Sequence, residues 1–170
     1  VHIPGFANDD LLDAEIAATI IGSGRSSILY RSLVSDRRVA STVGAFVDRR
    51  AHSSLLTMYA FASKAETTAE ELSAAIMDAI ASAVIDDDRR HGAVNRLRTA
   101  HAAELQKVNG VADSVAWSTL FWNDPAYVNG VLERYNNVAT DAVRQICAAC
   151  TDPSKIVRLD VVPRAGSDGA

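Results

Sequence analysis

The chain has 170 residues, of which 48% are hydrophobic and 22% are charged, and its formal net charge is −4. This composition is typical of one globular domain with a sizeable core. The acidic balance and the lack of a basic stripe argue against a nucleic-acid partner, and no apolar run approaches the ~20 residues that a membrane span needs.

The chain opens Val1-His2-Ile3-Pro4, without Met. We therefore expect a piece of a longer protein or a processed start, and a signal peptide on a precursor stays open. Frequent Ala, Arg, Asp and Val are typical of a GC-rich bacterial genome, with cytoplasm and periplasm both open as compartments. Residues 1–6 are expected to be short and extended. A helix capped by Asn8 or Asp9 should follow and run to Ile21.

Two glycines after Ile21 break this helix, and a second short helix is expected over residues 25–35. Residues 39–47 and 55–62 then predict two antiparallel strands around a polar turn at 48–54. The second strand should place Leu56, Met58 and Ala60 on one face, and Leu55, Thr57, Tyr59 and Phe61 on the other.

The second half of the chain is predicted to be helical. Thr67-Thr-Ala-Glu70 is a capping box, and the helix after it should bury Leu72, Ile76, Ile80 and Val84. A long helical stretch should follow residues 86–90 and reach about Phe121, with a weak point at Asn109-Gly110. Its expected apolar stripe is Val94, Leu97, His101, Leu105, Val108, Ala112 and Val115.

Two more helices are expected, one starting at Pro125 and one capped by Thr140. Residues 156–162 should form a closing strand, followed by a frayed tail over 164–170. Strands that cluster together with helices between them predict an α+β fold, a two-layer α/β sandwich with a mainly antiparallel sheet and helices on one face.

Four motifs in this order resemble those of one peptidase family. Gly22-Ser-Gly-Arg-Ser-Ser-Ile-Leu-Tyr-Arg-Ser-Leu-Val34 is similar to the M16 glycine turn and the helix after it, and Trp122-Asn-Asp-Pro125 to the family's G-D-P turn. Tyr135-Asn-Asn-Val-Ala-Thr-Asp-Ala-Val143 resembles its cap and helix, and Val157-Arg-Leu-Asp-Val-Val-Pro163 its closing strand. Together they resemble the C-terminal inactive domain of M16 (pitrilysin/insulinase-like, processing-peptidase-like) zinc metallopeptidases.

The resemblance implies a LuxS/MPP-like metallohydrolase fold, with one domain over residues 1–163. It also implies that the chain lacks a cofactor of its own, and that an active H-x-x-E-H domain or subunit holds the zinc. The two would enclose a chamber in which unfolded peptide is degraded, and a homodimer is a further option. The alternative is a degenerate M16-like peptide-binding or assembly module whose whole protein has no proteolysis.

The zinc motif of active M16 domains has a damaged counterpart here. The nearest string is His101-Ala-Ala-Glu104-Leu105, in which apolar Leu105 stands where the second histidine ligand would be. His91 and His101 are ten residues apart, ~15 Å on a helix and on different faces. We therefore interpret His101 and Glu104 as ordinary helix residues. The other histidines lie in a terminus and a turn (His2, His52).

Two peptide-contact positions follow from the resemblance alone. Inactive M16 domains that assist catalysis carry an Arg and a Tyr that donate to developing negative charge. The matching positions here are Val34 and Ser41, so both donors are replaced. Arg37 and Arg38 lie nearby and are interpreted as surface charges.

Further motifs have weaker functional interpretations. Cys147-Ala-Ala-Cys150 ends a predicted helix, so packing is favoured over metal or redox chemistry. Gly22-Ser-Gly24 lacks the rest of a phosphate loop, and no partners can be assigned that would make Ser26 or Ser27 a nucleophile. A separate enzyme using the cysteines, or His91 with His101, is the third hypothesis. An aromatic cluster favours core packing over an interface (Trp117, Phe121, Trp122, Tyr127).

Overall fold

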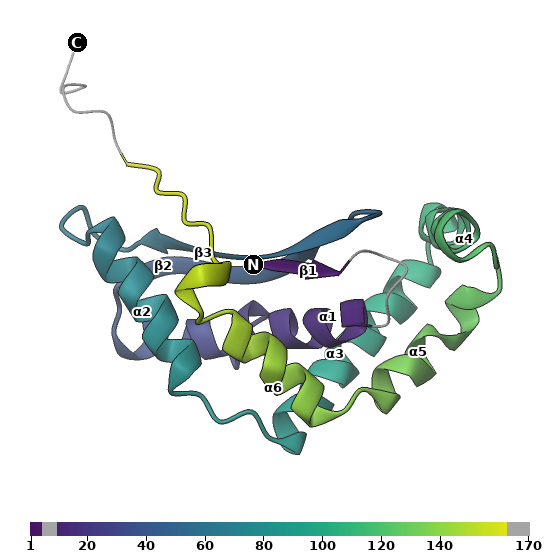
Figure 1. The fold of residues 1–170 in the computed structure, drawn as a ribbon, viewed down its shortest axis with the longest axis horizontal. Coiled ribbons are helices and arrows are strands. Elements are labelled where there is room, and N and C mark those ends of the chain that lie inside the picture. The colour runs from purple at the N-terminus through teal and green to yellow at the C-terminus, as the bar shows by residue number, and fades with distance from the viewer. Residues whose placement is uncertain (5–9, 163–170) are drawn as a thin grey trace, which may run out of the picture.

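A computed structural model describes residues 1–4 and 10–162, and it confirms the α+β class (Figure 1). Its antiparallel sheet has the order β1-β3-β2, made of β1 (His2–Pro4), β2 (Ala40–Asp48) and β3 (Ser53–Ala62). Helices cover one face of this sheet. The predicted caps Asn8 and Asp9 and the predicted tail over 164–170 lie outside the described residues.

The β2–β3 hairpin forms where the sequence predicts it, with Phe46 opposite Thr57 and Gly44 opposite Tyr59. The faces of β3 are also confirmed, since Leu56 is buried on the helix side while Tyr59 is exposed. β1 pairs only with the first residues of β3, from His2 opposite Leu55 to Pro4 opposite Ser53.

Helix α1 (Asp10–Gly22) lies between the sheet and the other helices, in contact with β2, α3 and α6. Apolar residues occupy every side of this helix, so it has no polar face to leave in water. Its buried apolar residues are Leu11, Ala14, Ile16, Ala17, Ala18, Ile20 and Ile21. Its last residue, Gly22, lies against the backbone of β2 at Gly44 and Ala45, which leaves no room for a side chain.

The predicted second helix forms over a shorter span and with wider turns. Its described core is the π-helical segment η1 (Tyr30–Asp36), in which Leu33 is fully buried. Helix α2 (Ala69–Ala81) starts one residue later than predicted, because Thr68 and Glu71, rather than Thr67 and Glu70, form the capping box. The helix ends before Val84, whose predicted burial is wrong: Val84 is 70% exposed.

The predicted long helix is two helices, α3 (Asp87–Leu105) and α4 (Val108–Trp122). The break falls at residues 106–107, earlier than Asn109-Gly110. The predicted stripe holds along α3, where Val94 is buried and Leu97, His101 and Leu105 are half-buried. It is wrong at Val108, which is 86% exposed, and at Ala112, which is also exposed. Because the chain changes direction after Leu105, the face that continues the stripe of α3 no longer points to the core.

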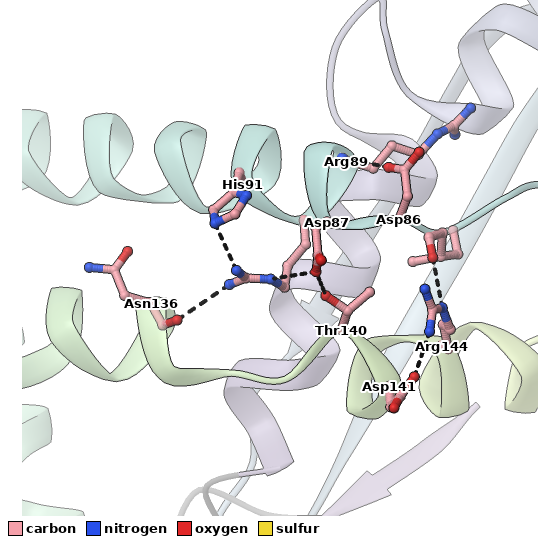
Figure 2. Close-up of polar contacts among 10 residues, drawn as sticks. Asp86, Asp87, Arg89, His91, Asn136, Thr140, Asp141 and Arg144 are labelled. Atoms are coloured by element: carbon pink, nitrogen blue, oxygen red, sulfur yellow. Dashed lines mark hydrogen bonds and ion pairs between the residues drawn. The ribbon is translucent and has the colours of Figure 1, made fainter.

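The start of α3 is fastened to the junction of α5 (Tyr127–Asn137) and α6 (Thr140–Ala149), as Figure 2 shows. The Thr140 hydroxyl donates to Asp87, which lowers the pKa of that carboxyl. Arg90 Nη1 donates to the carbonyl of Asn136 at 3.3 Å. Thr140 is therefore the first residue of α6, and its side chain connects α6 to α3. The sequence predicted Thr140 as the N-cap of this helix, but the N-cap is Ala139.

The predicted closing strand over residues 156–162 is wrong for the described chain. After η2 (Pro153–Lys155), this segment has no strand partner among the described residues and extends away from the helices (Figure 1). Arg158 pairs with Glu70 at the start of α2 at 3.2 Å. The apolar side chains stay in water, with Val157 85%, Leu159 87% and Val161 90% exposed.

Candidate functional site

The sheet face opposite the helices carries three exposed aromatic residues, Phe46, Tyr59 and Phe61, which we call the aromatic sheet face. The ring centroids lie 6.4 Å apart for Phe46 and Tyr59 and 5.8 Å apart for Tyr59 and Phe61. Gly44 lies beneath the Tyr59 ring, where a Cβ atom would come closer than 3.0 Å to it. The glycine therefore lets the tyrosine lie flat across the neighbouring strand.

The two peptide-contact positions suggested by the resemblance offer little polar chemistry. Val34 is half-buried on η1 and packs against the core. Ser41 is exposed at an irregularity in β2, and its hydroxyl lies 3.2 Å from the carbonyl of Ala62 and 3.3 Å from that of Phe61. Contact of either residue with a peptide stays a prediction. Arg37 forms an exposed ion pair with Asp78.

A cavity of about 320 Å³ lies among α1, α3, α4 and α5. We call it the helix pocket; it is lined by Leu11, Leu12, Glu15, Arg49, His101, Glu104, Gly110, Asp113, Ser114, Trp117, Ser118, Trp122, Tyr127, Val128, Val131 and Tyr135. Its polar part is built on Glu15, which is only 6% exposed. The Tyr135 hydroxyl donates to one carboxylate oxygen of Glu15, and Arg49 pairs with the other.

Burial raises the pKa of the Glu15 carboxyl, and Arg49 and Tyr135 offset part of that rise. Burial, reinforced by the neighbouring carboxylate, also raises the pKa of Tyr135. Sequence reasoning missed this pair because its members are 120 residues apart. A signal was nevertheless present, since Glu15 stands in the buried run 14–21 of α1, whose other residues are apolar except Thr19, and an acid buried there needs a partner.

Two residues of the damaged zinc motif, His101 and Glu104, line this pocket, and Leu105 does not. His101 is half-buried, and its Nε2 atom is buried with no hydrogen-bond partner among the residues that the structure describes. Glu104 also lines the pocket but pairs with Lys107 at 2.9 Å, and Leu105 has no ligating atom. Residues 1–4 and 10–162 contain no group of three or more His, Cys, Asp or Glu side chains placed to hold a metal ion. These residues therefore do not fit a zinc site.

The other histidine of the third hypothesis lies apart from this pocket. His91 is exposed near the start of α3, and its Nε2 atom lies 2.8 Å from Nη2 of Arg90 (Figure 2). The structure thus does not bring His91 and His101 to one site.

The aromatic residues of 117–127 include one that is buried, Tyr127, and one that is exposed, Trp117. Trp122 stacks on the buried Tyr127 with centroids 4.0 Å apart, and Trp117 stacks on Phe121 at 5.0 Å. Trp117 is nevertheless 46% exposed at the helix pocket. Core packing describes Tyr127 well, whereas Trp117 also forms part of a concave surface.

Cys147 and Cys150 are buried free thiols at the end of α6. Burial raises the pKa of Cys147 to about 12 and that of Cys150 to about 11. At neutral pH both groups are thiols rather than thiolates, the form that reacts and binds metals. Their burial agrees with the interpretation of both cysteines as packing residues.

We expect neither thiol to react with Ellman's reagent at pH 8 in the folded chain, because both are protonated and buried. Two thiols per chain should react promptly once urea unfolds it. Fast labelling of the folded chain would contradict the packing interpretation, and a Cys150→Ser variant would then identify the reactive group.

The fold is that of known peptidase structures. The inactive peptidase domain of a candidate zinc protease from Bordetella parapertussis superposes with a TM-score of 0.76 at 18% identity, covering 91% of this chain and 84% of that one. A candidate zinc protease from Bordetella pertussis Tohama I gives 0.72 at 18% identity, covering 91% and 87%. A protease from Helicobacter pylori gives 0.74 at 18% identity, and this chain spans only 36% of its length.

The sequence comparison extends the likeness from fold to family. The family model of the peptidase M16 inactive domain matches residues 1–97, more than half of the chain. The chain therefore belongs to the peptidase M16 inactive-domain family, as its motifs predicted. No curated protein matches its sequence significantly. None of the described helices is long and apolar enough to cross a membrane.

Proposed function

We propose that this chain is the non-catalytic domain of an M16 zinc peptidase and forms half of a peptide-degradation chamber with an active domain. The observation that carries the proposal is the aromatic sheet face. One face of the sheet is covered by helices, while the other leaves Phe46 49%, Tyr59 39% and Phe61 62% exposed. Grouped exposed apolar side chains of this kind mark surfaces that contact another chain.

The sheet edge beside this face suits an extended peptide. β1 covers only the first residues of β3, so residues 57–62 of β3 have no neighbour on that side within the described chain. A peptide added there would be held by main-chain hydrogen bonds, which are independent of its sequence. This mode fits unfolded substrates of varied sequence.

The proposal assigns the metal chemistry to the partner. The active domain would hold the zinc and the glutamate that activates water, and residues 1–163, as one domain, would supply a wall and part of the peptide surface. The assignment is supported by the unsuitable ligands around His101 and by membership of the inactive-domain family.

The direct test compares the isolated chain with the parent protein or complex. Alone, the chain should retain no stoichiometric zinc and should cleave no unfolded peptide. In the complete peptidase, replacing Tyr59 and Phe61 together with serine should lower kcat/KM for an internally quenched unfolded peptide by about tenfold, the equivalent of ~1.4 kcal/mol of lost apolar contact. Zinc content should not change.

Val84→Ser is the matched control, because Val84 is an exposed apolar residue away from the aromatic sheet face. It should leave kcat/KM unchanged. One tightly held zinc per isolated chain with chelator-sensitive cleavage would reject the proposal, as would equal kcat/KM for the double variant and the wild type.

The second candidate is a degenerate peptide-binding or assembly module. It is favoured by the environment of Val34 and Ser41, because the first is half-buried against the core and the hydroxyl of the second donates to β3 carbonyls. A parent protein that binds unfolded peptide through Tyr59 and Phe61 but cleaves none of it, even with added zinc, would favour this module. An H-x-x-E-H partner with measurable turnover would exclude it.

A further inference from the structure

The helix pocket has an aromatic and apolar wall. Trp117 and Trp122 come from α4, Tyr127 from the start of α5, and Leu11 and Leu12 from α1. Trp122 and Tyr127 stack nearly parallel, with an angle of 11° between their planes. Its volume of about 320 Å³ is at the lower end of the range for small-molecule sites.

Most charges at this pocket are already compensated by the protein. Glu15 is held by Arg49 and Tyr135, and Glu104 by Lys107. Two acceptors on this lining have no partner among the residues that the structure describes: the carboxylate of Asp113, which is exposed at the pocket, and the buried Nε2 atom of His101. In the tautomer with its proton on Nδ1, that nitrogen accepts a hydrogen bond.

The aromatic wall already holds one cation. The guanidinium carbon of Arg134 lies 3.9 Å from the centroid of the Tyr127 ring. Aromatic faces attract cations through the ring quadrupole, most strongly where water is excluded. Because Tyr127 is buried between Arg134 and Trp122, a ligand in the pocket would meet the aromatic wall chiefly at Trp117, which is 46% exposed and whose ring can attract a second positive group.

The acceptors and the aromatic wall of the pocket favour a ligand of one charge over others. An anion would meet the carboxylate of Asp113, and a purely apolar ligand would leave the buried His101 Nε2 without a hydrogen bond. A protonated amine or guanidinium on an apolar body would donate to Asp113 and His101 while its body fills the aromatic wall. We propose that the helix pocket is a binding site for an amphipathic cation of this kind, either a free amine or the basic side chain of a peptide.

The proposal goes beyond the peptide chamber. The pocket is formed mainly by helices, its described lining residues all come from this chain, and Phe46, Tyr59 and Phe61 are not among them. Binding there can therefore be measured on this chain alone, and its outcome is separate from the outcome of the peptidase assays.

The chain carries its own reporter for the test. It has two tryptophans, Trp117 and Trp122, and both line the pocket. We would titrate tryptophan fluorescence with three probes of one shape and different charge: phenethylamine, 2-phenylethanol and 3-phenylpropionate. The amine should bind saturably and at least about tenfold more tightly than the other two, since a cation over partly desolvated rings and beside a carboxylate gains on the order of tenfold or more.

A variant then tests the assigned acceptor. Asp113→Asn should lower the affinity for phenethylamine by about tenfold, to the level of the alcohol, because the amide keeps the shape and loses the charge. Glu66→Gln, which removes a charge from the exposed connection between β3 and α2, should leave the affinity unchanged. Circular dichroism checks that both variants fold, and the three-probe series on the unchanged chain decides the question even if a variant does not.

A peptide arm identifies the source of the cation. Acetyl-Ala-Phe-Lys-Ala-amide is compared with the same peptide carrying norleucine in place of lysine. Tighter binding of the lysine peptide supports a peptide side chain as the ligand, and binding of phenethylamine without the peptide supports a free amine. Equal binding of the three small probes, no saturable signal from phenethylamine, or wild-type affinity in Asp113→Asn would overturn the proposal.

Discussion

Replacing Gly22 with alanine should lower the free energy of unfolding by at least about 3 kcal/mol, because the new methyl group would overlap the backbone of a neighbouring strand. A Cβ atom at Gly22 would lie closer than 3.0 Å to backbone atoms of Gly44 and Ala45 in β2. Backbone atoms cannot move aside by a change of rotamer, so α1 would have to lift from the sheet. The measurement is a urea unfolding curve followed by circular dichroism.

Gly92→Ala is the matched control for this result. Gly92 lies within α3, and a Cβ atom there would meet nothing within 4 Å. Alanine is the better helix former by up to about 1 kcal/mol, so this variant should be slightly more stable than the wild type. Equal unfolding midpoints for Gly22→Ala and the wild type would contradict the packing of α1 against β2.

The second large effect concerns the buried acid. Arg49→Ala should cost about 2 kcal/mol at pH 8, less than for a fully enclosed pair because the Arg49 side chain is 49% exposed. The variant leaves the Glu15 carboxylate buried without its cation, which raises the pKa of that carboxyl further. A carboxyl whose pKa is raised by folding destabilises the folded state when the pH is above the pKa that the group has in the unfolded chain. For Glu15 that ordinary pKa is 4.5. The loss should therefore shrink as the pH falls towards 4.5.

Urea midpoints at pH 5, 6, 7 and 8 would measure this dependence. Arg50→Ala removes a neighbouring arginine whose ion pair with Asp48 is exposed, so it should cost less than about 1 kcal/mol at every pH. Combining Arg49→Ala with Glu15→Gln should recover most of the loss at pH 8. A loss in Arg49→Ala that is the same at pH 5 and pH 8 would mean that Arg49 contributes through packing rather than charge.

The elements that the sequence predicts well are those with local causes. The hairpin follows from two β-rich runs around a polar turn, and α1 follows from apolar residues at helical spacing. The wrong predictions of burial concern residues that continue the apolar spacing of a helix after the helix has ended or changed direction. Val84 and Val108 keep the spacing of their stripes, yet the helix has ended or turned, so they are exposed.

The closing segment and the helix pocket depend on distant partners. Residues 156–162 alternate as a strand should, but strand formation requires an edge to pair with, which no local pattern specifies. The pocket joins Glu15, Arg49 and Tyr135, whose contacts depend on how four helices and the turn between β2 and β3 pack. From the sequence, the family motifs and the unsuitable zinc ligands were predictable, whereas the site that the histidine string borders was not.

The central position of α1 has a consequence for the chain while it is being synthesised. This helix packs against β2 on one side and α6 on the other, and α6 begins at Thr140. At ribosomal rates of ~5–20 residues per second, roughly ten seconds separate the appearance of α1 from that of α6. Throughout that interval Ile16 and its apolar neighbours lack part of their native cover, so the nascent chain should be a client for chaperones that bind apolar helices. Pairing α1 with an element so distant in sequence also favours slow, all-or-none folding over stepwise assembly from the N-terminus.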